Sequence, residues 1–215
     1  SINNSGNRLI AGAPNSAANG NDSGQALIYE LNANNQWVQL GGDINGETGN
    51  NLSGRAVAIN NNGTIVAIGA PFNDGVNGSL SGQVRVYELN ASNQWVQLGA
   101  DIDGDSVQNQ FGISVAINDD GTKVAAGAYL NDANGDNSGQ VKVYTLNASN
   151  QWIKLGNDVL GDMEQDQSGR SITMTHNGAD LIIGATGNDG NGNNSGQVRV
   201  YELINDVPSM ASSAS

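Results

Sequence analysis

Phe111-Gly112-Ile113-Ser114-Val115-Ala116-Ile117 is followed by the turn Asn118-Asp119-Asp120-Gly121 and by the apolar run Lys123-Val124-Ala125-Ala126-Gly127-Ala128. The first segment alternates apolar with small residues, which is typical of a β-strand with one buried face. Gly121 gives the turn a residue that adopts positive φ at little steric cost. The apolar run that follows is typical of a strand buried on both faces. This stretch therefore predicts a β-hairpin.

Two more strands are predicted directly after this hairpin. A loop rich in Asn, Asp and Gly covers residues 131–138, and residues 140–146 then alternate with period two. The turn at residues 147–150 leads into Gln151-Trp152-Ile153-Lys154-Leu155, the last strand of the unit. Four successive antiparallel strands form a meander, which is the unit of a propeller blade.

The same four-stranded unit recurs along the chain about every 57 residues. Ser-Gly-Gln recurs at spacings of 58, 57 and 57, and Gly-Ala recurs with it near the end of each second strand. A fixed period of this size indicates an array of one supersecondary unit whose faces are covered by its neighbours. The Ser-Gly-Gln copies begin at Ser23, Ser81, Ser138 and Ser195, and the Gly-Ala copies begin at Gly12, Gly69, Gly127 and Gly184.

The predicted fold class is therefore all-β, a β-propeller segment spanning residues 1–203. Its repeats are bounded at 1–52, 53–110, 111–167 and 168–203, and residues 204–215 are predicted to be a Ser/Ala-rich linker or tail. The first strand of the first repeat is represented only by Ser1-Ile2, and the fourth repeat lacks a matching last strand. We expect either a segment of a larger propeller or strands shared between several chains.

Composition excludes several classes of partner. The 215-residue chain has 8 Lys and Arg against 21 Asp and Glu, a formal net charge of −13, and no cysteine. Nucleic acids and anionic membrane surfaces require clusters of Lys and Arg, so neither is an expected partner. No run of 18 apolar residues is present, so direct membrane insertion is not expected. Disulfides and thiolate metal sites are excluded.

The repeat resembles the FG-GAP repeat, the blade unit of the integrin α-subunit head. Phe111-Gly112 supplies the first half of the motif, while Gly12-Ala13-Pro14 and Gly69-Ala70-Pro71 supply the second half. This resemblance implies a secreted or cell-surface binding or adhesion module that is not an enzyme, with a protein or carbohydrate ligand on a cell surface or matrix. The alternative is a structural subunit of a surface filament or array, self-assembled by exchange of strands or blades. No residue is predicted to be catalytic, because His176 lies alone in a turn.

Calcium is the one cofactor that the sequence suggests. The calcium loop of the integrin type is shortened here to turns such as Asn118-Asp119-Asp120-Gly121, too short to surround an ion. Two other loop classes alternate Asp, Asn and Gly, which fits either a hard-cation loop or ordinary turn chemistry. Candidate ligands in the connections between repeats are Asp43, Glu47, Asp101, Asp103, Asp105, Asp158 and Asp162, and weaker candidates between the second and third strands are Asp74, Asp132 and Asp189.

The three tryptophans also follow the period, at Trp37, Trp95 and Trp152. They fit a set of sugar-stacking side chains, one for each repeat. They fit better a packing role in which each indole holds the outer strand of its blade against the neighbouring blade.

Overall fold

The computed structural model describes residues 1–204 and 207–214, and they form four antiparallel sheets without helices. No helix in this part of the chain is long and apolar enough to cross a membrane.

Blade 1 contains β1 (Arg8–Ala13), β2 (Gln25–Leu31), β3 (Trp37–Gln39) and β4 (Ile44–Asn45). Blade 2 contains β5 (Ala56–Ile59), β6 (Ile65–Ala70), β7 (Gln83–Leu89), β8 (Trp95–Gln97) and β9 (Ile102–Asp103). Blade 3 contains β10 (Ser114–Ile117), β11 (Lys123–Ala128), β12 (Gln140–Leu146) and β13 (Trp152–Leu160). Blade 4 contains β14 (Ser168–Met174), β15 (Asp180–Ala185), β16 (Gln197–Ile204) and β17 (Val207–Ala214).

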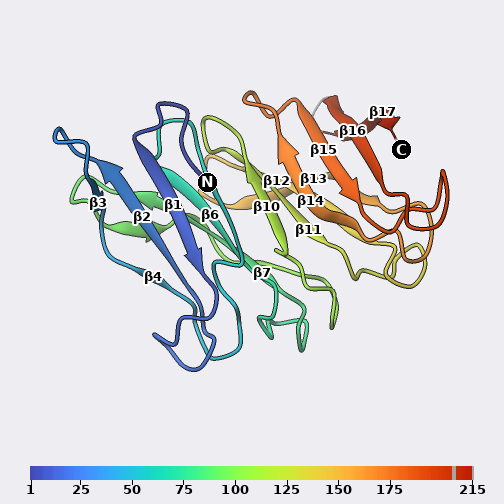
Figure 1. Cartoon of the computed structure of the whole chain (residues 1–215), viewed down its shortest axis with the longest axis horizontal. Coiled ribbons are helices and arrows are strands. Elements are labelled where there is room, and N and C mark those ends of the chain that lie inside the picture. The colour runs from blue at the N-terminus through green and yellow to red at the C-terminus, as the bar shows by residue number, and fades with distance from the viewer. Residues whose placement is uncertain (205–206, 215) are drawn as a thin grey trace.

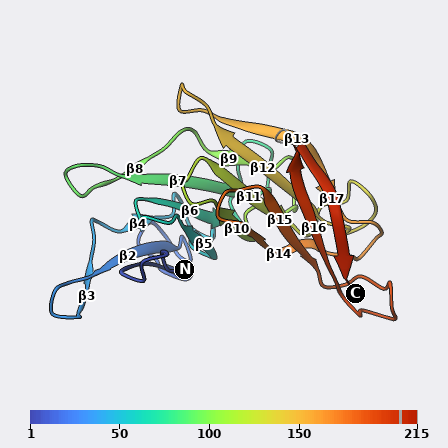
Figure 2. The same cartoon turned by 90° about the horizontal axis from the view of Figure 1, so that it is seen from above.

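The predicted fold class is confirmed. The four sheets stand side by side in chain order (Figure 1), and each is a meander of antiparallel neighbours. Seen from above, the first strands β5, β10 and β14 gather on the inside while β3, β8, β13 and β17 lie on the outside (Figure 2). The inner strands of neighbouring blades contact each other, as expected around the axis of a propeller.

Three apolar clusters lie between the blades. Ile10 and Ile28 of blade 1 pack with Val66 and Ile68 of blade 2, and equivalent clusters join blade 2 to blade 3 and blade 3 to blade 4. Strand β6 is buried along its whole length, as the apolar composition of the second strands predicts. Blades 2 and 3 therefore bury both faces of their central strands, whereas blades 1 and 4, with one neighbour each among the described residues, leave these strands partly exposed.

The recurrent Gly-Ala pair is explained by the closeness of these contacts. A Cβ built on Gly12, Gly69 or Gly127 would overlap the carbonyl oxygen of a glycine at the start of the next blade. Those partners are Gly54, Gly112 and Gly169, each with positive φ. Backbone of one blade therefore touches backbone of the next, and only glycine leaves room for it.

Two predicted segments differ from expectation. The connections between repeats begin as strand, because Ile44, Ile102 and Val159 are buried and pair with the third strand of their blade. In the predicted linker, residues 207–214 form β17, which pairs antiparallel with β16. Small Ser and Ala side chains are compatible with that edge, whose backbone groups would otherwise lack partners. Residues 205–206 and 215 of the predicted tail lie outside the described residues.

The indoles join neighbouring blades, as the packing interpretation predicts. Trp95 Nε1 donates to the Leu40 carbonyl at 2.8 Å, and Trp152 Nε1 donates to the Leu98 carbonyl at 2.8 Å. Trp37 has no preceding blade within the described chain, and 42% of its surface is exposed.

Replacing Trp152 by phenylalanine is expected to lower the free energy of unfolding by about 1 kcal/mol, because one partly buried hydrogen bond between blades is lost. Trp37→Phe is the matched control and is expected to change stability by less than about 0.5 kcal/mol. Urea unfolding followed by far-UV circular dichroism compares the two. Equal losses would show that the bond to Leu98 does not stabilise the blade contact.

Candidate functional site

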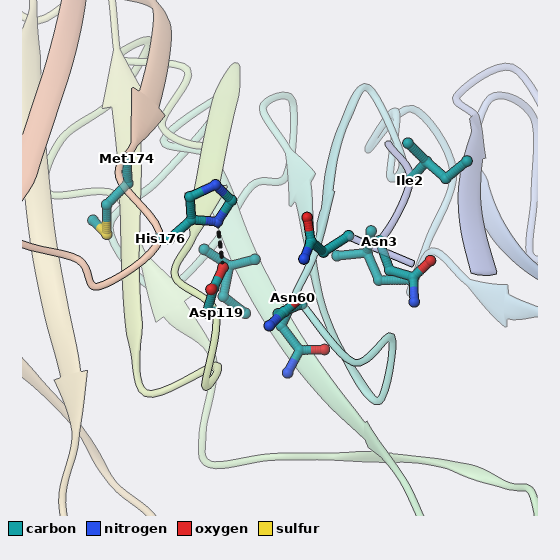
Figure 3. Close-up of a pocket in the computed structure, with 10 residues that line it drawn as sticks. Ile2, Asn3, Asn60, Asp119, Met174 and His176 are labelled. Carbon is teal, nitrogen blue, oxygen red and sulfur yellow. Dashed lines mark hydrogen bonds and ion pairs between the residues drawn. The ribbon is translucent and has the colours of Figure 1, made fainter. Parts of the chain in front are cut away.

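A pocket of about 350 Å³ lies at one end of the propeller axis, where the turns after the first strands meet (Figure 3). Its polar wall consists of four asparagines together with Asp119 and His176, and its apolar wall consists of isoleucine and methionine side chains. We call it the axial pocket. It is lined by Ile2, Asn3, Asn4, Ile59, Asn60, Asn61, Ile117, Asp119, Met174 and His176.

Backbone hydrogen bonds tie the four turns together. Asn4 N donates to Asn61 O at 3.3 Å, Asn61 N donates to Asp119 O at 3.2 Å, and Asp119 N donates to His176 O at 2.8 Å. These four residues occupy the same position of successive repeats. The repeat thus places one side chain from every blade around the axis.

His176 and Asp119 form a hydrogen-bonded pair in this pocket. His176 Nδ1 lies 2.8 Å from Asp119 Oδ1, and 80% of the imidazole side chain is exposed (Figure 3). The bond to Nδ1 leaves Nε2 available, and an aspartate in this position fixes the tautomer and orientation of the ring. This is the arrangement of a general base and its orienting carboxylate.

Asn60 supplies a buried amide without a partner on the opposite turn. Its side chain is 1% exposed, and its Oδ1 accepts from Thr64 N and Ile65 N, both at 2.9 Å. Its Nδ2 has no hydrogen-bond partner. In the first repeat, by contrast, Asn3 Nδ2 donates to Asn7 Oδ1 at 2.9 Å. Asn60 therefore gives the wall of the axial pocket a buried donor that no described protein group satisfies.

The sequence interpretation missed this pair, because it treated His176 as isolated. The signal was present in the repeat period, since 176 minus 57 is 119. Equivalent turns of adjacent blades lie next to each other in a propeller, so the period alone places Asp119 beside His176.

The acids between repeats serve mainly as partners for buried cations. Glu47 pairs with Arg85, Asp105 pairs with Lys142, and Asp162 pairs with Arg199. In each case the cation belongs to the next blade and is buried. Breaking such a pair would leave an uncompensated buried charge, so these carboxylates hold blades together.

Most of the other predicted calcium ligands also have protein partners. Asp43 accepts from Gln39, Asp101 accepts from Gln97, and Asp158 accepts from Lys154 and Gln140. The weaker candidates accept backbone N–H groups within their own loops, which is ordinary turn chemistry: Asp74 from Leu80, Asp132 from Asn137 and Asp189 from Asn194.

Four of the ten candidates share one pocket. Glu47, Asp74, Asp101 and Asp103 line a depression of about 420 Å³ between blades 1 and 2. Among the described residues, however, no three Asp, Glu, His or Cys side chains are arranged to hold a metal ion. Calcium binding by this chain stays a prediction.

Burial raises the pKa of Asp103 above the usual range of aspartate. A hydrogen bond from Gln83 opposes this shift, and the neighbouring charges of Asp101 and Glu47 add to it. Since the folded state binds the proton more tightly than the unfolded chain does, the ionised carboxylate destabilises the fold. The loss of stability develops as pH rises through and above the pKa that Asp103 has in the unfolded chain. At lower pH the carboxyl is protonated in both states and the loss is absent.

Asp103→Asn is expected to raise the free energy of unfolding by about 0.5 kcal/mol at pH 7, a small gain because solvent screens a half-buried group. Asparagine already stands at the equivalent position in blade 1, where Asn45 pairs with Gln25 as Asp103 pairs with Gln83. Denaturant unfolding at pH 7 and at pH 3 measures the effect, and the gain should vanish at pH 3. A variant that is less stable than the parent at pH 7 would contradict this sign.

Comparison with known families and structures bears out the repeat. The FG-GAP repeat model matches residues 100–144, which span the end of blade 2 and most of blade 3. A search of curated proteins found no match. The family match covers the motif Phe111-Gly112 on which the resemblance depends.

The chain is similar to solved β-propeller structures that carry lactonase names. A putative 6-phosphogluconolactonase from Bacteroides fragilis has a TM-score of 0.63 at 14% identity, covering 98% of this chain and 52% of its own. The periplasmic gluconolactonase of Pseudomonas aeruginosa has a TM-score of 0.62 at 13% identity, covering 99% and 55%. A putative 6-phosphogluconolactonase from Bacteroides uniformis has a TM-score of 0.64 at 16% identity, covering 98% and 52%. The chain spans about half the length of these structures.

These comparisons overturn the predicted function. A non-catalytic adhesion module, with a filament subunit as alternative, was expected from the resemblance to integrin heads. The structures that share this fold carry the names of lactone-opening enzymes instead. The same structures contradict the prediction that the chain is not an enzyme, which relied on the family resemblance and on His176 lying alone in a turn.

Proposed function

Because the chain carries an FG-GAP repeat and folds as propeller blades, we propose that it forms part of a β-propeller hydrolase that opens a sugar lactone in the axial pocket. The observation that carries this proposal is the 2.8 Å contact between His176 Nδ1 and Asp119 Oδ1 in a pocket whose wall also contains the buried, unpartnered amide nitrogen of Asn60. The lactonase names of similar structures support the choice of reaction.

The pair supplies the base that lactone hydrolysis requires. With Nδ1–H donated to Asp119, His176 Nε2 takes a proton from water while the water oxygen attacks the lactone carbonyl carbon. The carbonyl oxygen becomes an oxyanion, and Asn60 Nδ2 donates to it. The ring C–O bond then breaks, and the imidazolium returns its proton to the departing ring oxygen. The product is the open hydroxy acid, which loses its carboxyl proton to solvent.

The remaining walls suit a sugar. Side-chain amides of Asn4 and Asn61 offer donors and acceptors to hydroxyl groups, while Ile59 and Ile117 supply apolar surface for the C–H groups of a ring. A volume of about 350 Å³ lies in the range of small-molecule sites. The carbohydrate partner expected from the sequence therefore enters the proposal as a substrate.

The test is hydrolysis of δ-gluconolactone by the purified chain, measured as acid release in a pH-stat at pH 7 and corrected for the spontaneous reaction. We expect a rate that saturates with lactone and is proportional to protein. A rate no greater than that given by the same concentration of free imidazole would refute the proposal.

A secreted or cell-surface location also stays a prediction for this protein. The excess of 21 acidic over 8 basic residues and the lack of cysteine are compatible with it. Fractionation of the source cells with an antibody against the chain tests it, and recovery only from the cytoplasm would exclude it.

A further inference from the structure

A second pocket lies at the other end of the inner strands, away from the axial pocket. Arg55 directly precedes β5 and Asn60 directly follows it, while Arg170 lies near the start of β14 and His176 follows its end. The members of the first pair are five positions apart and those of the second pair six, which corresponds to roughly 17 to 20 Å of extended strand. Arg55 and Arg170 line this pocket of about 220 Å³ together with Tyr129, Phe72, Ile113 and Gln110. We call it the arginine pocket.

Two positive charges converge there in a strongly acidic chain. The molecule has 21 acidic and 8 basic residues, yet the lining of the arginine pocket contains no carboxylate. Most of the other cations have acidic partners: Arg8 with Glu30, Arg85 with Glu47, Lys142 with Asp105, Lys154 with Asp158 and Arg199 with Asp162. Within the described residues, neither Arg55 nor Arg170 pairs with a carboxylate, and both are exposed. Their charge is available to a ligand.

The repeat does not require these side chains. Arg55, Ile113 and Arg170 follow the glycine that begins the first strand in blades 2, 3 and 4, so an arginine is replaced by isoleucine without loss of the blade. Tyr129 stands where blades 1 and 2 have the prolines of the Gly-Ala-Pro motif. A departure from the repeat that gathers at one pocket points to binding rather than folding.

Aromatic side chains lie beside the charged groups of the arginine pocket and add apolar surface to it. The Arg170 guanidinium carbon lies 4.8 Å from the centre of the Tyr129 ring, a cation–π contact that orients the guanidinium. Phe72 and Ile113 add an apolar wall, and Gln110 adds an amide. The pocket therefore combines an anion-binding pair with a surface for the body of a small molecule.

We propose that the arginine pocket binds a small organic oxyanion, with its phosphate or carboxylate group on the guanidinium groups of Arg55 and Arg170 and its body against Tyr129 and Phe72. Guanidinium groups match the oxygen spacing of both anions and bind them with two parallel hydrogen bonds. The volume of about 220 Å³ limits the bound part to roughly the size of a monosaccharide derivative. This binding site is separate from the axial pocket and does not depend on lactone hydrolysis there.

Isothermal titration of the full chain at low ionic strength tests the proposal with glucose 6-phosphate, gluconate, inorganic phosphate and glucose. We expect saturable binding of glucose 6-phosphate or gluconate that is at least tenfold tighter than that of glucose and that weakens in 0.5 M NaCl. The ranking of the two sugar anions identifies the preferred oxyanion. Inorganic phosphate, which has no body to contact the aromatic wall, should bind more weakly than the phosphate ester.

Single-charge variants locate the site. Arg55→Gln and Arg170→Gln should each weaken binding at least tenfold, and the double variant should abolish it. Lys154→Gln removes the same charge from the exposed face of β13 and should leave the affinity within twofold. Because both arginines are exposed, unchanged thermal melts are expected for all variants. Equal losses in Lys154→Gln, no loss in the arginine variants, or no binding of either sugar anion at millimolar concentration would overturn the proposal.

Discussion

Gly69→Ala is expected to destabilise the protein by about 3 kcal/mol or more, enough to unfold a marginal domain. The alanine Cβ would overlap the carbonyl oxygen of Gly112 and would lie 2.9 Å from its carbonyl carbon. Both atoms belong to the backbone at the start of the next blade, so they cannot move without separating blades 2 and 3. Gly69 lies within β6 and does not have positive φ, so the loss would come from overlap rather than from backbone strain.

Gly184→Ala is the matched control, because Gly184 occupies the same position of blade 4. No following blade within the described chain covers it. Its added Cβ would overlap only the Ser171 hydroxyl, which can rotate away, and would lie at an ordinary 3.7 Å from the Ser171 backbone oxygen. We expect a loss of about 1 kcal/mol or less in denaturant unfolding. If the two alanine variants lost equal stability, contact between blade backbones would not be the reason for the Gly-Ala repeat.

His176→Gln is expected to lower kcat for δ-gluconolactone hydrolysis by about 10²–10³-fold, the usual contribution of a positioned general base. KM should change little, because the amides of Asn4 and Asn61, which are proposed to bind the sugar, are unchanged. The side chain is exposed, so the variant should fold like the parent, which circular dichroism checks. A variant that retains more than a third of the parental kcat would exclude His176 as the base.

In the proposed reaction Asp119 orients His176, and a variant of Asp119 separates this orientation from general charge effects. Asp119→Asn should lower kcat by about tenfold with KM unchanged, because an amide no longer enforces the productive tautomer of His176. Glu164→Gln removes one negative charge from an exposed loop between blades 3 and 4 and should leave kcat unaltered. A rise of KM with constant kcat in Asp119→Asn would instead assign Asp119 to substrate binding.

Much of the fold follows from local sequence. Alternation in residues 140–146, the apolar run at residues 123–128 and the Gly121 turn each predict their element, and the structure confirms them as β12, β11 and the turn between β10 and β11. Recurrence of the unit predicts that blades cover each other. The strand β17 in the tail was not predicted. A Ser/Ala segment without a clear strand pattern still pairs when the edge strand of a neighbouring sheet offers its backbone hydrogen bonds.

The roles of the acids could not be predicted in the same way. Asp105 and Asp162 have the spacing of cation ligands, but Lys142 and Arg199 approach them from the next blade. Asp103 belongs to the same loop pattern and is instead half-buried beside Gln83. A rule based on spacing considers only one segment of the chain. The cations that pair with Asp105 and Asp162 are each 37 positions away in the sequence.

The sequence by itself determined the blades, their number in this chain and the need for glycine where they touch, because these depend on short-range periodicity and on a repeat that every copy must satisfy. Tertiary structure decided which side chains work together. His176 meets Asp119, and Arg55 shares a pocket with Arg170, because curvature about the axis brings the ends of separate inner strands together. The proposed sites use positions that differ between copies, and the neighbours of these positions are set by the packing of whole blades.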